Sequence, residues 1–276
     1  MSRLMFDISE HDDSNLDFDA IADQGIGLII RVGFGAGNGR LDYEFQDNVA
    51  KAESRGIDYG LYWYSYASDA DQAYLEACRL GSCAFDYCGS HLVYPLFYDV
   101  EEPGLENVSR ETCSVFADTM RMNGHKYGVY ASYYWWLNYC PNMLEDPDCT
   151  RWVAYWSDEQ PLIDRWDIWQ FGSYDFYGRQ IDGNYSDYVI ADHINQSLES
   201  LALDVLCGRY GILRERMEKL GDRYAETQNY INECYVKAND VLRGKYGNGD
   251  ERKRLLGKDY PCVQYIVDSF FRGDYS

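Results

Sequence analysis

Aromatic-rich apolar segments alternate with segments of helical spacing through the first half of the chain. The apolar runs cover 4–8, 28–32, 59–66, 93–103 and 126–132, and helical spacing lies between them at 43–55, 68–87 and 109–122. Strands joined by crossover helices become parallel neighbours, so this order predicts a parallel sheet. After about residue 140 strand-like runs continue at 151–156, 167–171 and 180–184, while helices become scarce. The predicted fold is α/β, an irregular, TIM-like β/α barrel that is regular in its first half and reduced in its second.

Two acidic residues lie near the C-terminal end of the run 93–103. Asp99 and Glu101 are two residues apart, so the alternation of side chains along a strand points both to the same side. Their Cα atoms would lie roughly 6.5–7 Å apart, close enough for one ionised carboxylate to raise the pKa of the other. One carboxyl could then stay protonated as a general acid while its neighbour stays charged. The alternative is a strand end that presents two acids to solvent.

Composition narrows the possible partners. The formal net charge of −21 repels a phosphate backbone and therefore disfavours nucleic acid. The 27 Tyr, 7 Trp and 11 Phe are an excess of aromatic residues, and flat rings with a polar tip suit the faces of sugars. No apolar run approaches the ~18 residues of a membrane span, and no secretory signal precedes the first strand. We therefore expect no membrane insertion.

The nine cysteines and four histidines show no metal-ligand spacing. The cysteines form no CxxC pair and no cluster with histidine, which predicts that the chain has no metal site. Their odd number argues against a fully oxidised disulfide framework. Buried thiols in a chain that folds in a reducing cytosol are the favoured interpretation.

The chain changes character after residues 193–197. From residue 198 the spacing is helical and the sequence repeats itself at an offset of 36 positions, so that Leu206-x-Gly208-x-Tyr210-Gly211 recurs as Leu242-x-Gly244-x-Tyr246-Gly247. Tandem copies are typical of a multivalent binder, and a structural oligomerisation tail is the alternative. The predicted organisation is a barrel domain at 1–192, a linker at 193–197, and a repeat domain at 198–276 with three-helix units at about 198–233 and 234–272.

Eight short blocks follow the order of a known family. They are Phe6-Asp7-Ile8-Ser9, 28–32, Gly60-Leu61-Tyr62-Trp63-Tyr64, Phe97-Tyr98-Asp99-Val100-Glu101, Gly128-Val129-Tyr130-Ala131-Ser132, Trp152-x-Ala154-x-Trp156, Asp167-Ile168-Trp169-Gln170-Phe171 and Ile181-Asp182-Gly183-Asn184. In these blocks the chain resembles glycoside hydrolase family 25, the lysozymes of phages and bacteria that cleave after N-acetylmuramic acid. The resemblance spans about residues 4–190.

This resemblance implies roles for four acids. Glu101 would be the general acid that protonates the leaving oxygen, and Asp99 would stabilise positive charge at the sugar by orienting the substrate's 2-acetamido group. Asp7 and Asp182 would complete a floor of four carboxylates that tunes Glu101 and holds substrate. The reaction needs one protonated and one charged carboxyl, and no metal or cofactor. The spacing leaves both retaining and inverting chemistry open, and the family leans toward retention.

Further side chains are candidates for substrate contact. Arg31 could reach the substrate or pair with the carboxylate cluster. Aromatic rings at predicted strand ends could stack on saccharides, with core packing as the alternative for each. These rings belong to Tyr62, Tyr64, Tyr130, Trp156 and Trp169.

The tail has a resemblance of its own. Residues 244–252 resemble the CW-seven type of cell-wall-binding repeat found at the end of some phage lysins. The first copy has Ile212-Leu213-Arg214 where the second has Asn248-Gly249-Asp250, so its ligand site is expected to be weakened or lost. The candidate wall-binding residues are Lys245, Tyr246, Asn248, Asp250 and Arg252.

Both resemblances imply an endolysin, a lysozyme that hydrolyses the β-1,4 bond between N-acetylmuramic acid and N-acetylglucosamine in bacterial peptidoglycan. Peptidoglycan is the expected partner, and a homo-oligomer through the tail stays open. The missing export signal and the tail predict synthesis in the bacterial cytoplasm and release through a holin, as for a phage or prophage lysin. Two alternatives are a non-catalytic peptidoglycan-binding protein and a chitinase-like hydrolase.

Overall fold

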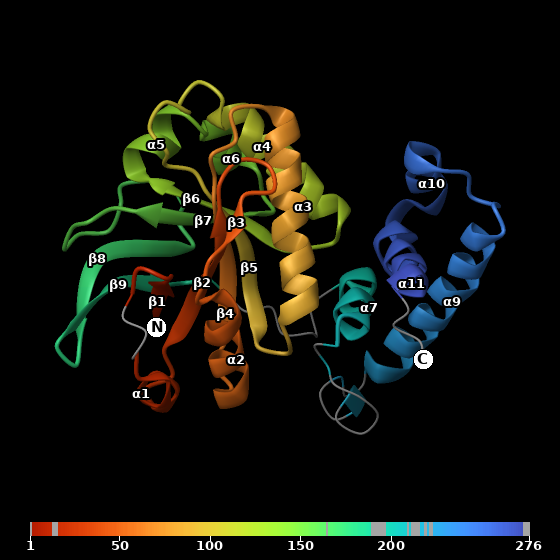
Figure 1. Cartoon of the computed structure of the whole chain (residues 1–276), viewed down its shortest axis with the longest axis horizontal. Coiled ribbons are helices and arrows are strands. Elements are labelled where there is room, and N and C mark those ends of the chain that lie inside the picture. Colours follow the sequence, from red (N-terminus) through yellow and green to blue (C-terminus); the bar gives the residue numbers. More distant parts are fainter. Residues whose placement is uncertain are drawn as a thin grey trace. The chain divides into compact units, whose positions relative to one another are not determined.

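Eight strands close into a barrel in the computed structural model, which describes residues 2–12, 16–163, 165–188, 197–208, 210, 216–217, 220 and 223–272. From β1 to β7 each barrel strand runs parallel to the next one, which makes β8 the last parallel strand, and β9 closes the ring against β1. The predicted β/α barrel is confirmed (Figure 1). Around the barrel the strands are β1 (Arg3–Ile8), β2 (Gly27–Phe34), β4 (Tyr59–Tyr64), β5 (Leu92–Asp99), β6 (Tyr127–Ser132), β7 (Cys149–Ala154), β8 (Ile168–Phe176) and β9 (Arg179–Ser186).

Strand β9 departs from the parallel arrangement. It runs antiparallel to both β8 and β1. The cause is local, because β8 and β9 are joined by Tyr177 and Gly178, whose φ angles are 53° and 83°. Two positive φ angles in a two-residue loop are typical of a type I′ hairpin, and so short a loop can only reverse the chain. The parallel sheet predicted from the first half of the chain therefore stops at β8.

Helices cover the barrel in the crossovers that precede β7. The helices in the crossovers pack against the outside of the strands that they connect (Figure 1). Between β7 and β9 the described residues, with a gap at position 164, contain no helix, as expected for a reduced second half. The helices of this unit are α1 (Phe18–Asp23), α2 (Phe45–Arg55), α3 (Ala70–Tyr87), α4 (Ser109–Met122), α5 (Tyr133–Asn138) and α6 (Pro141–Glu145), and a short strand β3 (Arg40–Leu41) pairs with β2.

Side-chain alternation separates two apolar layers. Residues such as Trp63 and Tyr98 point outward and pack against the helices, while their neighbours Tyr62 and Phe97 point into the barrel. Trp152 lies at the centre of the inner layer, with its ring centroid 4.4 to 5.9 Å from the inward-pointing aromatic rings. The inner layer is Met5, Ile29, Tyr62, Tyr94, Phe97, Tyr130, Trp152 and Ile168. It fills the barrel below the strand ends, where polar residues begin.

A glycine makes room for this inner layer. A Cβ atom at Gly128 would lie 2.5 Å from both the Phe97 ring and the Thr150 carbonyl oxygen. Neither neighbour can retreat, because the ring is buried in the barrel and the oxygen belongs to β7. Strand β6 therefore needs glycine at this position for Phe97 to pack beneath Asp99.

The C-terminal part of the chain forms a second compact unit. The two units are Met1–Ile190 and Ala191–Ser276, and the expected linker at 193–197 lies outside the described residues except for Ser197. The second unit has its own core and consists of α7 (Leu198–Leu206), α9 (Tyr224–Leu242), α10 (Gly249–Leu256), η2 (Gly257–Asp259) and α11 (Tyr260–Arg272). No helix within the described ranges is long and apolar enough to cross a bilayer.

The two sequence copies are fused through one helix. At the repeat offset of 36, α7 corresponds to residues 234–242 and α11 corresponds to residues 224–236. Both corresponding stretches lie in α9, which runs without a break across the expected boundary at 233/234. The last helix of the first copy is therefore continuous with the first helix of the second. The two copies share one core.

Candidate active site

The carboxyl ends of the barrel strands bring four acids together. Asp7 and Asp182 are directly opposite each other on β1 and β9, so their Cβ atoms are roughly 4.5–5.5 Å apart. Asp99 ends β5, and Glu101 follows it at the same rim. The charge of Asp7 acts on the pKa of Asp99, and that of Asp182 acts on the pKa of Glu101. The predicted carboxylates thus form one electrostatic cluster.

Asp99 is the most deeply buried of the four. Its side chain is enclosed, the residue is 4% exposed, and Oδ1 has no hydrogen-bond partner. Burial raises its pKa well above the usual range, the charges of Glu101 and Asp7 add to this rise, and the Arg31 guanidinium opposes it. The protonated form of Asp99 is therefore favoured more than in an ordinary aspartate. Positive charge or an N–H donor from a substrate would lower this pKa.

Glu101 is more accessible. It lies just beyond the strand, and its side chain is only partly buried. Burial is the largest cause that raises the pKa of Glu101, followed by the charges of Asp182 and Glu102, while the nearby Tyr130 hydroxyl opposes the rise. A carboxyl that is reachable from solvent and holds its proton more tightly than usual suits a proton donor.

Two amide side chains hold Asp7. Gln170 Nε2 and Asn184 Nδ2 both donate to Asp7 Oδ2, at 3.0 and 2.8 Å. Burial and the charge of Asp182 nevertheless raise the pKa of Asp7 to about 8. Asp182 also has a raised pKa, because it is buried and lies near Asp12. The Asp7 and Asp182 pair therefore retains a proton close to neutral pH.

The sequence analysis missed three members of this cluster. Gln170 and Asn184 are in the quoted blocks, and each lies two residues from an inward-pointing neighbour, Ile168 or Asp182. Strand alternation could have identified both. Asp12 follows β1 and accepts hydrogen bonds from the amide and hydroxyl of Ser9. No spacing rule indicates that this loop folds back toward Asp182.

Arg31 is paired with two nearby acidic side chains, those of Asp42 and Glu10. Its Nε donates to Asp42 at 2.7 Å, a second guanidinium nitrogen lies 3.6 Å from Glu10, and the residue is 7% exposed. The guanidinium carbon also lies 5.0 Å from the centre of the Phe34 ring. The structure therefore pairs Arg31 with Asp42 and Glu10, and its charge also lowers the pKa of Asp99 in the predicted carboxylate cluster. Contact of Arg31 with substrate stays a prediction.

The five candidate aromatic residues have different environments. Tyr62 and Tyr130 are almost fully buried in the inner layer, while Tyr64 is partly exposed and donates to Glu102 at 3.0 Å. Trp156 is 67% exposed, and its Nε1 donates to Gln170 Oε1 at 3.0 Å. Of the five, Trp156 offers the most accessible ring at the carboxylate cluster.

Trp169 lies outside the site. The neighbouring Gln170 points into the barrel, so strand alternation turns Trp169 to the opposite face of β8. There its Nε1 donates to the Tyr155 carbonyl at 2.7 Å, and its ring packs beside Phe171. The predicted substrate contact of Trp169 does not agree with this placement.

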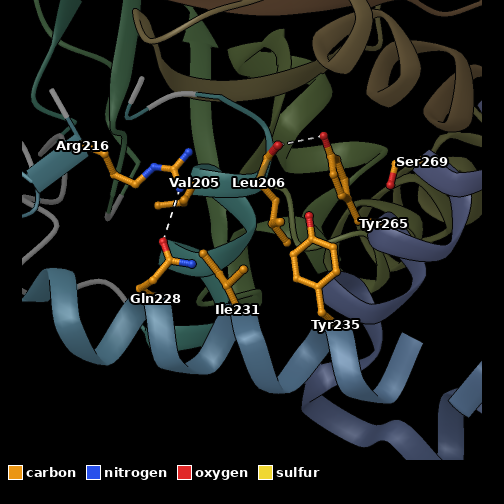
Figure 2. Close-up of a pocket in the computed structure, with 8 residues that line it drawn as sticks. All are labelled: Val205, Leu206, Arg216, Gln228, Ile231, Tyr235, Tyr265 and Ser269. Carbon is orange, nitrogen blue, oxygen red and sulfur yellow. Dashed lines mark hydrogen bonds between the residues drawn. The ribbon is translucent and has the colours of Figure 1, made fainter. Parts of the chain in front are cut away.

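The second unit contains a pocket of ≈ 330 Å³. Figure 2 shows Arg216 and Gln228 paired at one side of it, at 3.3 Å, with Tyr235 and Tyr265 at the other. The pair recurs in the second copy as Arg252 and Gln264, at 3.1 Å. The pocket combines side chains of both copies, and its lining is Val205, Leu206, Arg216, Gln228, Ile231, Tyr235, Tyr265 and Ser269.

The candidate wall-binding residues surround the turn before α10. Arg252 donates to the Gly247 carbonyl at 3.2 and 3.0 Å and to Asn248 Oδ1 at 3.0 Å, so it holds this turn. Lys245 pairs with Asp240 at 2.7 Å, Tyr246 is partly buried, and Asp250 is fully exposed. The corresponding segment of the first copy, 212–214, lies outside the described residues.

Several solved structures with the same fold are named as an autolysin, an endolysin or a lysozyme. The modular autolysin of Streptococcus pneumoniae is 24% identical with a TM-score of 0.55, and the match covers 67% of this chain and 46% of that chain. The catalytic domain of an endolysin from a bacteriophage of Listeria monocytogenes is 22% identical with a TM-score of 0.55, covering 67% and 93%. A Streptomyces coelicolor lysozyme is 20% identical with a TM-score of 0.56, covering 68% and 93%. No curated protein matches the chain.

Family models match both parts of the sequence. The CW_7 repeat model matches residues 238–270, which lie in the second copy of the tail. The model described as glycosyl hydrolases family 25 matches residues 6–177, which include Asp7, Asp99 and Glu101. That match covers more than half of the 276 residues, and the barrel has the fold of the named lysozymes, so the chain belongs to glycosyl hydrolases family 25.

Proposed function

We propose that this protein is an N-acetylmuramidase that hydrolyses the β-1,4 bond between N-acetylmuramic acid and N-acetylglucosamine in bacterial peptidoglycan. The observation that carries the proposal is the pair at the end of β5, a buried Asp99 beside a partly exposed Glu101, both with raised pKa values. Glycosidases use such a pair of carboxyl groups across an oxocarbenium-like transition state. Membership of family 25 supports the same reaction.

Glu101 acts as the proton donor in the proposed mechanism. As the bond between the anomeric carbon and the bridging oxygen breaks, the proton of Glu101 passes to that oxygen and leaves a carboxylate behind. The carboxylate then accepts a proton from the water that adds to the anomeric carbon. The partial exposure of Glu101 suits both steps, because the group must meet first a bulky leaving sugar and then water.

Asp99 stabilises the sugar in this scheme. Its Oδ1 is buried without a partner, so an N–H of the substrate's 2-acetamido group would satisfy it. The bond would also lower the pKa of Asp99 and favour its charged form as positive charge develops on the sugar. The exposed ring of Trp156 offers a stacking surface for a saccharide beside the cluster.

Glycan release from purified peptidoglycan tests the proposal. New reducing ends on N-acetylmuramic acid are expected, with much slower release from chitin, which lacks the lactyl ether and peptide. Faster release from chitin would favour the chitinase-like alternative. Pelleting with cell walls without any new reducing ends would show a non-catalytic binder and overturn the assignment.

The tail is proposed to bind the cell wall. The CW_7 match in the second copy and the recurring Arg–Gln pair support this role. The pocket supports it too, because a guanidinium of the first copy and hydroxyl groups of the second copy line the same cavity. Action at the wall as a phage or prophage endolysin, released from the cytoplasm by a holin, completes the proposal. The repeat and the endolysins among the similar structures support it.

Deleting residues 198–276 is expected to weaken sedimentation with cell walls far more than the cleavage of short soluble glycan fragments. The reason is that the barrel unit contains the whole carboxylate cluster, while two linked weak sites bind an insoluble polymer by avidity. Co-sedimentation and fragment hydrolysis are measured on the same preparations.

A point variant refines this prediction. Arg252→Ala removes the bonds that hold the turn before α10 and should reduce wall binding, whereas Arg254→Ala, two residues away on an exposed position, should not. Equal loss of wall binding and fragment cleavage in the deletion would contradict a separate binding role for the tail.

A further inference from the structure

Trp156 combines an exposed ring with an engaged nitrogen. The residue is 67% exposed, yet its Nε1 donates a hydrogen bond of 3.0 Å to the buried Gln170, which is 2% exposed. Stacking of a sugar requires only the ring face. The hydrogen bond therefore has a role that a stacking platform alone does not explain.

This bond determines which way the Gln170 amide points. An indole nitrogen is a donor only, so the atom that faces Trp156 must be the carbonyl oxygen Oε1, and Nε2 must face Asp7. Tyr130 also donates to Oε1, at 2.9 Å. A hydroxyl group can reverse its direction and accept instead, so of these two contacts only Trp156 prevents the amide from flipping.

Asn184 is oriented in the same manner. The Trp152 Nε1 donates to Asn184 Oδ1 at 2.7 Å, which directs the Asn184 amide nitrogen to Asp7 Oδ2. Both amides thus present N–H groups to one oxygen of Asp7. Any proton that Asp7 holds is consequently located on the other oxygen, Oδ1.

We propose that Trp156 is a positioning residue, whose indole N–H acts through Gln170 to keep Asp7 Oδ2 a hydrogen-bond acceptor. The exposed Trp156 ring, on which a sugar would stack, is thereby linked to the charge of the carboxylate cluster. Without this N–H the Gln170 amide can turn over and offer its carbonyl to a protonated Asp7. The neutral form of Asp7 is then favoured, and its pKa rises. The kinetic readout of this proposal rests on the proposed hydrolase activity, whereas the spectroscopic readout does not.

The sign of the effect does not depend on which state of Asp7 is active. If the charged form is needed, the acidic limb of the rate profile moves to higher pH, and if the protonated form is needed, the basic limb moves to higher pH. One lost hydrogen bond to a charged group corresponds to a shift of roughly one pH unit. The titratable groups that face Asp7 are Asp12, Tyr62, Asp99, Tyr130 and Asp182.

The test compares Trp156→Phe, which keeps a ring and loses the N–H, with Trp169→Phe, which loses an indole N–H on the other face of β8. The pH profile of kcat should move upward by roughly one unit for Trp156→Phe and stay in place for Trp169→Phe. The double variant Trp156→Phe with Gln170→Met should shift the pH profile no further than Gln170→Met alone, because Trp156 acts on Asp7 only through Gln170. A change in KM with an unmoved profile would overturn the proposal.

A second readout is independent of turnover. In the full-length protein labelled with nitrogen-15 tryptophan, the indole N–H resonance of Trp156 is expected to follow the titration of the Asp7 and Asp182 pair, and Gln170→Met should abolish this dependence. Failure of wild-type protein to release glycans would reject the proposed function while leaving this measurement intact. An indole resonance that does not respond to pH in wild-type protein would reject the positioning role.

Discussion

Replacing Glu101 with glutamine is expected to lower the turnover of peptidoglycan by roughly 10² to 10⁴, the usual contribution of a positioned general acid. Glutamine keeps the shape of the side chain but has no proton to give to the bridging oxygen. Burial and the charge of Asp182 raise the pKa of Glu101, so the wild-type group retains its proton further toward neutral pH than an ordinary glutamate. The decisive measurement is kcat for reducing-end release, with KM recorded to separate chemistry from binding.

Glu102 supplies the matched control for this variant. It is adjacent in the chain, is also partly exposed, and accepts a hydrogen bond from Tyr64 at 3.0 Å. Glu102→Gln should therefore leave kcat within a few-fold of wild type. If Glu101→Gln also retains kcat within a few-fold, or if the two variants lose activity equally, another group supplies the proton.

Replacing Asp99 with asparagine is expected to change activity and stability in opposite directions. Activity should fall by roughly 10² to 10³, because the substituted amide cannot carry negative charge opposite the developing positive charge of the sugar. Stability at alkaline pH should rise, since Asp99 is 4% exposed, has an unpartnered oxygen and lies beside Glu101 and Asp7. Such a group costs stability when it is charged in the folded protein.

The pH dependence of this gain follows from the direction of the pKa shift. An unfolded aspartate ionises near pH ~3.9, whereas the pKa of Asp99 in the folded protein is well above its usual range. Its stabilising contribution is present below pH ~4 and is lost as the pH rises through the raised folded pKa. Asparagine has no such loss, so the Tm gain should be small at pH ~4 and should grow toward pH ~8, by about 2–4 °C for each kcal/mol relieved.

Thermal unfolding at both pH values tests this prediction. Asp86→Asn, an exposed carboxyl on α3, is the control and should shift Tm little at either pH. A lower Tm for Asp99→Asn at pH ~8 would mean that the charged carboxylate is satisfied in the folded protein, and would contradict the burial argument. Full activity of Asp99→Asn would remove Asp99 from the proposed mechanism.

The barrel could be predicted from the sequence because its signals are local. Apolar runs with strand length, separated by helical spacing, indicate crossovers and hence parallel neighbours. The direction of β9 could not be predicted in this way, because it depends on the backbone of Tyr177 and Gly178. The fusion of the two tail copies through α9 could not be predicted for a related reason. The repeat shows which positions of the two copies correspond, but it does not show where a helix ends.

The candidate site was predictable where two members lie two residues apart at the end of one strand. Asp99 and Glu101 share a side through simple alternation, and the same rule, applied to β8, would have separated Gln170 from Trp169. Arg31 could not be resolved from the sequence. Its inward direction is a matter of alternation, but its partners Asp42 and Glu10 come from loops whose approach no spacing describes.

The sequence by itself determined the strand and helix order, the Asp99 and Glu101 pair and the internal repeat of the tail, because periodicity and spacing act over a few neighbouring residues. Only the tertiary structure decided which acids meet and how each holds its proton. Asp7 lies opposite Asp182 because the barrel closes β9 against β1, and burial together with like charge then raises their pKa values. Those interactions depend on distance in space and on exclusion of water, and neither is encoded in the separation of residues along the chain.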